Sequence, residues 1–157
     1  MTVGRVCSRE TVVCRGNESL AIVAHLMLSS HVGSVVVVAD RGGRRVPEGI
    51  VTDRDVVRAV LSNDGPLERL TAEAVATPHP LVVQENEDLC SALDAMLSRG
   101  VRRAPVLDRS GSLVGIIAVD DFVGYLGEQI AKLARLVEAQ PERERLTSAK
   151  SRHESRT

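Results

Sequence analysis

The segment GIVTDRDVV, from Gly49 to Val57, joins a short apolar run to the beginning of an amphipathic pattern. Thr52 ends the apolar run, and Asp55 follows three residues later. A Thr-x-x-Asp sequence ahead of apolar residues is close to a capping box, in which the hydroxyl and the carboxylate each accept a backbone N–H at the start of a helix. The pattern therefore predicts a strand that turns into a helix, and it leaves open whether Thr52 and Asp55 also hold a ligand.

The same segment occurs a second time, as GIIAVDDFV from Gly115 to Val123, with alanine in place of the threonine. It is part of a longer repeat, because VVCRGNESLAIVAHLM (12–27) aligns without a gap with LVVQENEDLCSALDAM (81–96). Internal repeats of this kind indicate duplicated structural units. The first unit is expected at residues 6–62 and the second at residues 75–127, with a linker at 63–74.

Each unit has the same order of predicted elements, β-α-β-β-α. The first helix is indicated by apolar residues at i, i+3, i+4 and i+7, with an asparagine cap before it and a glycine that ends or nearly ends it. Two strands joined by a tight turn follow, and the second helix begins near Asp53 in one copy and near Asp120 in the other. The expected caps and terminating glycines are Asn17 and Gly33 in the first copy and Asn86 and Gly100 in the second.

The sequence after the second unit predicts a helical extension at 128–140 that ends at Pro141. Residues 141–157 alternate charged residues with Ser and Thr and have few apolar side chains to bury, so we expect a disordered tail there. The apolar residues expected on one face of the helix are Leu126, Ile130 and Leu133, with Leu136 or Val137.

The composition excludes several classes of protein. The chain has 157 residues, 43% of them hydrophobic, and a net charge of −1, which gives no reason to expect a nucleic-acid or membrane partner. Its only aromatic residues are Phe122 and Tyr125, so it has no platform for stacking nucleic-acid bases. Three cysteines without a CxxC pair, together with the missing signal peptide, lead us to expect a cytoplasmic protein.

No catalytic or metal-binding motif is found in the sequence. It contains no phosphate-binding loop of the Walker type, no G-x-S-x-G and no H-E-x-x-H. The four histidines are scattered, with spacings that do not fit a metal site: His25, His31, His79 and His153. We therefore expect neither an enzyme nor a metal-binding protein.

The tandem units resemble the CBS repeats that occur in pairs in many nucleotide-sensing proteins. Two segments carry the resemblance, PEGIVTDRDVVRAV (47–60) and RRAPVLDRSGSLVGIIAVDDFV (102–123). It covers about residues 6 to 126. The resemblance implies an α/β fold in which the two repeats pack together as a pseudo-twofold pair, known as a Bateman module.

In CBS pairs, the segment that matches GIVTDRD lies at a strand-to-helix turn and faces the cleft between the repeats. The resemblance therefore implies that Thr52 and Asp55 hold the ribose and phosphate of an adenosine nucleotide. The chemistry fits, because a carboxylate accepts hydrogen bonds from ribose hydroxyls and a helix N-terminus offers free N–H groups to phosphate. The second copy keeps Asp121 but has Ala118 in place of the hydroxyl, so two unequal sites are expected.

Family members often place basic residues where this chain has Arg102 and Arg103, and the resemblance implies that these arginines reach the phosphates. A solvated pair of arginines at a strand edge is the alternative. The adenine is expected to rest against the segments before the first helix of each repeat, at Thr11 and Val12 or at Pro80 to Val82.

The function implied by the resemblance is that of a non-catalytic regulatory module. It binds an adenosine nucleotide (AMP, ADP or ATP, with S-adenosylmethionine or NAD(H) as alternatives) and changes the activity of a partner protein that the sequence does not identify. We also expect a homodimer. The alternative function is a ligand-free CBS pair that serves for dimerisation or as an adaptor, in which Thr52 and Asp55 only cap a helix.

Overall fold

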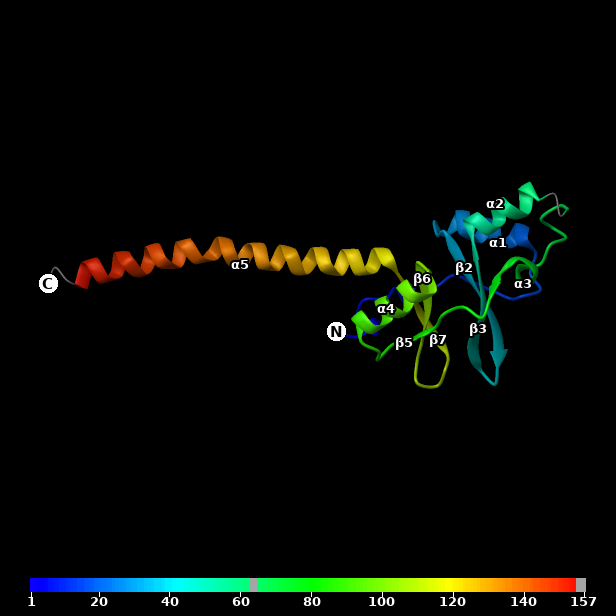
Figure 1. Cartoon of the computed structure of the whole chain (residues 1–157), viewed down its shortest axis with the longest axis horizontal. Helices are drawn as coiled ribbons and strands as arrows, with labels where there is room; N and C mark the ends of the chain where they lie inside the picture. Colours follow the sequence, from blue (N-terminus) through cyan, green and yellow to red (C-terminus); the bar gives the residue numbers. More distant parts are fainter. Residues whose placement is uncertain (63–64, 155–157) are drawn as a thin grey trace. The chain divides into compact units, whose positions relative to one another are not determined.

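The computed structural model describes residues 1–62 and 65–154, with side chains up to Glu138. The chain divides into two compact units, Met1–Val119 and the part from Asp120 onward, which we describe separately. The first unit contains two β-sheets, and it holds the first repeat and the second repeat as far as its last strand (Figure 1). The α/β class and the pairing of two repeats are therefore confirmed.

The elements of each repeat follow the predicted order. The strands form a four-stranded sheet in the order β1-β2-β3-β4 and a three-stranded sheet in the order β5-β6-β7. In each repeat the first strand is parallel to the second, which is antiparallel to the third. The first repeat comprises β1 (Val13–Cys14), α1 (Leu20–Ser29), β2 (Ser34–Arg41), β3 (Arg44–Thr52) and α2 (Asp53–Leu61). The second comprises β5 (Val83–Gln84), α4 (Leu89–Arg99), β6 (Arg103–Leu107), β7 (Leu113–Ala118) and the start of α5 (Val119–Glu154).

The segment that precedes each repeat pairs with the other repeat. β4 (Thr77–Pro78), which leads into the second repeat, is antiparallel to β3 of the first and pairs Gly49 with Pro78. At the matching position, Ser8 leads into the first repeat and forms a bridge to Ile116 in β7 of the second. Backbone hydrogen bonds therefore connect the two repeats in both directions, in addition to side-chain packing.

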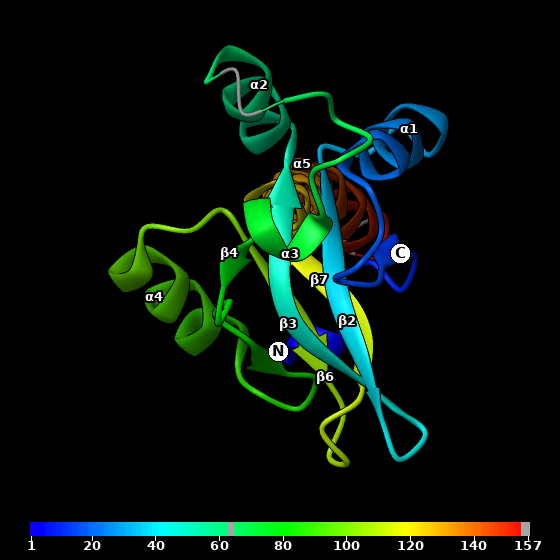
Figure 2. The ribbon, with the colours of Figure 1, turned by 90° about the vertical axis from the view of Figure 1, so that its right-hand side faces the viewer.

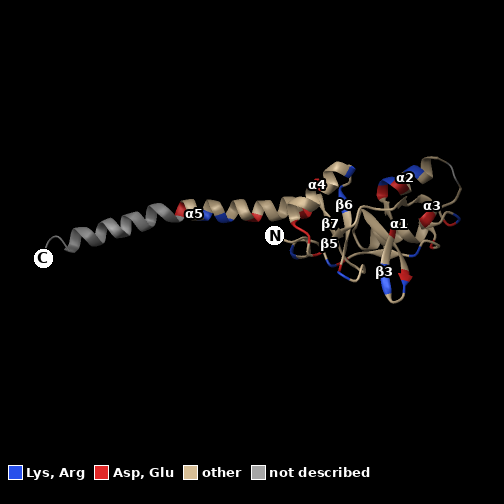
Figure 3. Ribbon diagram, turned by 60° about the horizontal axis from the view of Figure 1, so that its bottom comes forward, with Lys and Arg blue, Asp and Glu red and all other residues tan. Residues whose placement is uncertain are grey.

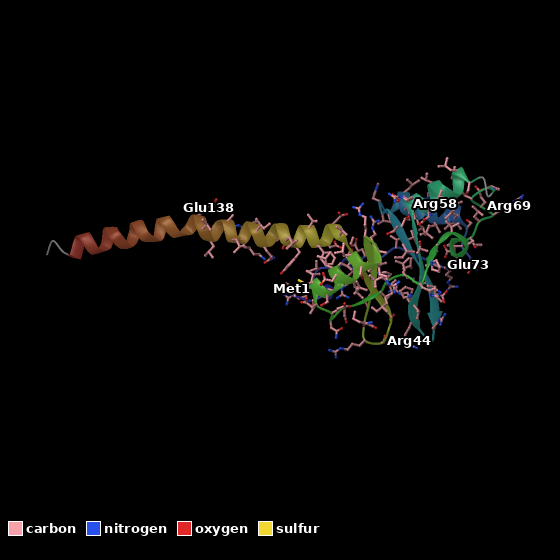
Figure 4. The ribbon with its side chains drawn as sticks, in the orientation of Figure 1. Met1, Arg44, Arg58, Arg69, Glu73 and Glu138 are labelled. Carbon is pink, nitrogen blue, oxygen red and sulfur yellow. The ribbon has the colours of Figure 1, made fainter. Side chains whose placement is uncertain are left out.

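Short helical turns ahead of these segments show the same exchange. The 3-10 turn η1 (Val3–Arg5) lies against the second repeat, where its first amide donates to the Glu87 carbonyl at 3.0 Å. α3 (Ala72–Val75) lies against the first repeat, where its first amide donates to the Glu18 carbonyl at 2.8 Å. Met1, before η1, and Glu73, in α3, are labelled in Figure 4. Residues before the first predicted unit thus complete the second repeat.

The apolar run at residues 35–37 is buried because both faces of β2 are covered, and Val38 is partly buried. Val35 and Val37 pack into a core formed with α1, α2 and α3. Figure 2 shows these three helices at the same end of β2 and β3. Val36 points to the opposite face, where it packs against Leu107 and its neighbours in the second repeat. A strand covered on both sides is expected to be continuously apolar rather than alternating.

The caps of the first helices differ from the predicted ones. α1 is capped by Ser19, whose hydroxyl accepts a backbone N–H at 3.4 Å, and α4 is capped by Asp88, whose carboxylate accepts one at 3.0 Å. The predictions of Asn17 and Asn86 were wrong because the glutamate after each asparagine closes a turn before the helix. Each glutamate accepts a backbone N–H at 3.1 Å, in Glu18 from Arg15 and in Glu87 from Gln84.

The end of α1 also differs from its prediction. α1 ends at Ser29, and His31 (φ 54°) takes the left-handed conformation that Gly100 (φ 64°) takes after α4. Gly33 was predicted to end or nearly end α1, but the helix ends four residues earlier, and the position that matches Gly100 carries His31. A non-glycine residue seldom adopts a positive φ, so the sequence gives little warning of this helix end.

α5 is longer than predicted, with 36 residues from Val119 to Glu154. It begins one residue before Asp120, which therefore lies in the first turn and not at the cap. The backbone continues through Pro141, so the predicted helix end there is not observed, and the expected tail at 141–157 is helical as far as Glu154. Residues 142–150 consist mainly of good helix formers, which extend an existing helix readily. Residues 155–157 lie outside the described part of the chain.

Candidate functional site

The turn between β3 and α2 contains the capping box predicted for the TDRD sequence. The Thr52 hydroxyl accepts from the Asp55 amide at 3.4 Å, and the Asp55 carboxylate accepts from the Thr52 amide at 2.9 Å. The Thr52 hydroxyl in turn donates to this carboxylate at 2.6 Å. The bonds hold Asp55, which is only 8% exposed, at the N-terminus of α2. A cap of this kind stabilises a helix by about 1 kcal/mol.

The other oxygen of the Asp55 carboxylate is paired with an arginine. Arg58, labelled on α2 in Figure 4, donates to Asp55 Oδ1 at 3.1 Å. The Arg58 side chain is 70% exposed and the Asp55 side chain 10%, so the ion pair is partly buried, with most of the arginine side chain in solvent. A ligand hydroxyl that donates to this oxygen would compete with a partner that water can solvate instead.

A cavity of about 390 Å³ lies beside this turn, between the two repeats. Its size falls within the range of small-molecule sites, about 300–1,000 Å³. The first repeat contributes Thr52 and Asp55 to the lining, and the second contributes Arg102 and Arg103 at the start of β6. Pro80, from the segment that leads into the second repeat, lines it as well. Five of the residues predicted for the site therefore meet around one cavity.

The charged groups around the cavity have an excess of positive charge. Arg54, Arg102 and Arg103 line it together with Asp53 and Asp55, which leaves one net positive charge. The first amides of α2 add the positive end of the helix dipole. The combination suits an anionic ligand that also carries hydroxyl groups, because the carboxylates can accept hydrogen bonds while the guanidinium groups donate them.

Gly33 leaves space for an arginine of the other repeat. A Cβ atom on Gly33 would lie 3.4 Å from Arg103 Nη2 and 3.4 Å from Asp53 Oδ2. The guanidinium group of Arg103 therefore extends from β6 to the start of α2. Arg103 is half-buried in this position, whereas Arg102 is exposed. The charges on the ribbon in Figure 3 show both signs at the start of α2.

Four of the predicted residues do not line this cavity. Val82 is exposed, and its neighbour Leu81 lines the cavity instead. Thr11 and Val12 occupy the matching positions of the first repeat, where Val12 packs against the core of that repeat. The Thr11 hydroxyl is buried and has no hydrogen-bond partner among the described residues. Asp121 lies in the first turn of α5, in the second unit, and its role remains a prediction.

Several lining residues were missed by the sequence analysis although a signal for them existed. Asp53 and Arg54 belong to the first turn of α2, which any ligand held by Thr52 and Asp55 would approach. Gly100 and Val101 directly precede the two predicted arginines. Thr77 could not be found this way, because it reaches the cavity only through the pairing of β4 with β3.

The described part of the chain shows no sign of a metal site or a membrane span. Among the side chains described, in residues 1–62 and 65–138, no three His, Cys, Asp or Glu residues are placed so that they could bind one metal ion. The helices within the same residues include none with the length and apolar character needed to cross a bilayer.

Two intertwined β-α-β-β-α repeats that share a cavity define a tandem-repeat α/β protein. The chain belongs to the CBS domain family, whose model matches residues 3–62 and 72–128. The match begins at η1 and resumes at α3, the two turns that are exchanged between the repeats. The family therefore includes both exchanged turns in its repeat unit, which the sequence analysis did not.

Comparisons with individual proteins agree with this assignment. An uncharacterised protein from Methanopyrus kandleri is 29% identical over 123 residues, which are 78% of this chain and 61% of that protein. A CBS domain protein from Pyrobaculum aerophilum, solved in complex with AMP, is 25% identical with a TM-score of 0.68, over 77% of this chain and 89% of the other. A CBS domain pair solved with 5′-methylthioadenosine and S-adenosylmethionine has the same fold, with 22% identity, a TM-score of 0.70 and coverages of 82% and 98%.

Proposed function

We propose that this CBS pair binds an adenosine nucleotide in the cavity between its repeats and acts as a non-catalytic regulatory module. The observation that carries the proposal is that Asp55 of the first repeat and Arg102 and Arg103 of the second line the same cavity. Carboxylates accept hydrogen bonds from ribose hydroxyls, and guanidinium groups bind phosphate oxygens. The related protein from Pyrobaculum aerophilum that was solved with AMP supports this choice of ligand.

The ribose is assigned to the carboxylate of Asp55. The Oδ2 atom of Asp55 already accepts the capping hydrogen bonds from Thr52. The ribose is therefore assigned to Oδ1, which accepts from Arg58 in the structure. Ribose hydroxyls that donate to Oδ1 replace Arg58, whose exposed side chain then returns to solvent at little cost. The capping box remains intact in this arrangement, so the helix start and the ligand contact use the same aspartate.

The adenine is assigned to the apolar part of the lining. Ile50, Pro80, Leu81 and Val101 supply aliphatic surface there. The first unit has no aromatic residue, since Phe122 and Tyr125 lie in the second, so the base is held between aliphatic side chains and backbone groups.

The phosphate is assigned to Arg102 and Arg103 and to the first amides of α2. One net positive charge in the lining balances a monophosphate better than a triphosphate, because each further phosphate adds uncompensated charge. We therefore expect AMP to bind more tightly than ATP. NAD(H) and S-adenosylmethionine present the same adenosine group and remain the alternatives.

The proposed regulatory function requires contacts with other protein chains. A CBS pair without a catalytic group has to pass a ligand signal to a partner, and we expect it to act as a homodimer on a protein that remains to be identified. The apolar residues that helices of the two repeats leave exposed offer surface for both contacts. The most exposed of them are Leu28 (75%) on α1, Leu61 (79%) on α2 and Leu97 (78%) on α4.

The second candidate function is a ligand-free dimerisation or adaptor unit. The capping box by itself explains why Thr52 and Asp55 occur at this spacing, and Arg58 already satisfies the remaining oxygen of Asp55. In this case the arginines and the cavity would have no ligand to hold.

Calorimetric titration with AMP, ADP, ATP, NADH and S-adenosylmethionine tests the proposal. The informative variants are Asp55→Asn, which keeps an oxygen for the cap, and the double variant Arg102→Gln/Arg103→Gln. We expect each to weaken the affinity for AMP by about 10- to 100-fold, because each removes charge-assisted hydrogen bonds to the ligand.

The matched controls are Asp94→Asn and Arg99→Gln on α4, which change the same residue types outside the cavity. Both should bind AMP as the unmodified protein does. If none of the five compounds binds at millimolar concentration, or if the controls lose affinity as much as the cavity variants, the adaptor function is the better description.

A further inference from the structure

α5 carries a stripe of exposed apolar residues along the part whose side chains are described, which ends at Glu138. The stripe residues are between 53% and 69% exposed: Val123, Leu126, Ile130, Leu133 and Val137. They follow one another at alternating steps of three and four residues. This is the a/d pattern of a heptad repeat, which places all five on one side of a helix over about 21 Å.

The residue types at these positions indicate the kind of assembly. The a positions carry the β-branched residues Val123, Ile130 and Val137, and the d positions carry Leu126 and Leu133. β-Branched residues at a with leucine at d favour a parallel, two-stranded coiled coil over trimers and tetramers.

The flanking positions indicate that the partner is a second copy of this chain. The e and g positions, which select partners by charge in coiled coils, carry no charge here: Gly127, Gln129, Ala134 and Leu136. All charged residues from 122 to 138 lie at other heptad positions: Glu128, Lys132, Arg135 and Glu138. Figure 3 shows short blue and red stretches on α5. Two identical helices can therefore meet in register without repulsion between like charges.

The glycine at an e position also favours close contact. No heavy atom of the described residues outside its own helix lies within 4 Å of the point where a Cβ atom of Gly127 would be. The missing side chain leaves room for the backbone of a second helix beside Leu126. In the next turn Ala134 takes the corresponding e position and is nearly as small.

We propose that α5 pairs with α5 of a second copy as a parallel coiled coil whose seam runs from Val123 to Val137. The seam ends there because Gln140 falls at the next d position and Pro141 follows it. This assembly does not depend on nucleotide binding at the cavity. The seam is shorter than a standard protein interface of about 20–30 residues per side, so the affinity of α5 for its partner is expected to be modest.

Disulfide trapping of the full chain tests both the partner and the orientation. In a parallel pair each d residue faces its own copy, so Leu126→Cys and Leu133→Cys should each form a covalent dimer on mild oxidation. The background variant is Cys90→Ser, because Cys90 is the exposed natural cysteine. Cys14 does not interfere, because burial, with a smaller contribution from Glu18, raises the pKa of its thiol to about 11.

The control is Lys132→Cys, on the outer side of the helix, which should form at least about 10-fold less covalent dimer under the same conditions. An antiparallel pair would link neither Leu126→Cys nor Leu133→Cys to itself. Equal trapping at Lys132 and Leu133, or no trapping at either d position, overturns the proposal.

Sedimentation equilibrium of the full chain gives a second readout. Ile130→Glu/Leu133→Glu should weaken self-association by at least about 10-fold, because it places four carboxylates in the seam of a dimer. Ala131→Glu/Lys132→Gln changes the net charge by the same amount at outer positions and should leave the association unchanged. Circular dichroism confirms that each variant is folded. A chain that is monomeric throughout, or that dimerises equally well with the charged seam, contradicts the proposal.

Discussion

The two repeats differ at positions that surround the cavity. The start of α2 in the first repeat carries Thr52, where the second repeat has Ala118. The start of β6 in the second repeat carries Arg102 and Arg103, where the first has Gly33 and Ser34. The cavity is lined by the start of α2 from the first repeat and by the start of β6 from the second. Divergence of the copies has therefore placed the polar groups around one cavity, which a comparison of single repeats would not reveal.

The repeats are much more alike in the way each completes the other. The exchanged segments bring a backbone next to a glycine in both repeats, at Gly49 and at Gly115. A Cβ atom on Gly115 would lie 2.6 Å from the Ser8 carbonyl oxygen, whereas on Gly49 it would lie 2.8 Å from the Ala76 Cβ. The backbone contact in the second repeat is thus tighter and less able to move aside.

The largest effect is expected for Gly115→Ala. It should lower the free energy of unfolding by about 3 kcal/mol, and Gly49→Ala by about 1–2 kcal/mol, because the added methyl group forces apart packed segments. Urea unfolding followed by circular dichroism measures both. Gly124→Ala on α5, where no described atom lies within 4 Å outside the helix itself, serves as the control and should stabilise slightly. Equal losses at Gly115 and Gly124 would show that the exchanged segment does not restrict this position.

The exchanged segments are a part of the fold that the sequence did not predict. The repeats, the order of their elements and the capping box were all predicted, because each leaves a periodic or local pattern in side chains. β4 and the bridge at Ser8 have one or two residues each and pair through backbone groups, so they leave no pattern. Thr77 was missed as a cavity residue for this reason.

The family resemblance singled out four polar residues that lie far apart in the sequence, and the structure brings them to one cavity: Thr52, Asp55, Arg102 and Arg103. That they hold a ligand there stays a prediction. The ends of α1 and α5 were missed because one residue near each end adopts a conformation that its residue type usually avoids. A histidine adopts a left-handed conformation after α1, and a proline is accommodated within α5.

A smaller effect is expected from exchanging the residues at the two helix starts. Thr52→Ala should lower the free energy of unfolding by about 1 kcal/mol, because the Asp55 amide loses its acceptor. Ala118→Thr adds a hydroxyl at the residue before α5 and should raise the stability by about 0.5–1 kcal/mol, since Asp121 already stands at the capping-box spacing.

Thermal and urea unfolding of the two single variants and of the double variant measure this exchange. Thr52→Ser keeps the hydroxyl and should retain most of the stability. If Ala118→Thr is neutral while Thr52→Ala is destabilising, a threonine hydroxyl does not cap α5 as it caps α2. The two helix starts then differ by more than the one hydroxyl group.

The smallest effect is expected in the turns that join the second and third strands of each repeat. The two turns differ in the number of hydrogen bonds that their aspartate accepts. Asp40 accepts one bond in the first turn, from the Gly43 amide at 3.0 Å. Asp108 accepts three in the second, from the Ser110 hydroxyl at 2.6 Å and from the Ser110 and Ser112 amides at 2.8 and 3.0 Å. These bonds, that of the Ser110 hydroxyl first, lower the pKa of Asp108 from its ordinary value.

A lowered pKa fixes the sign of the pH dependence at Asp108. Its contribution to stability is fully present above the unfolded-state pKa of about 3.9 and is lost as the pH falls through the lowered value. Asp108→Ala should therefore destabilise the protein more at about pH 6 than at about pH 3, and more than Asp40→Ala at about pH 6. NMR titration of the side-chain carboxyl group measures the pKa directly. A midpoint at or above the ordinary value, or a loss of stability that does not shrink in acid, would mean that the three bonds do not favour the ionised carboxylate and that the two turns are held in the same way.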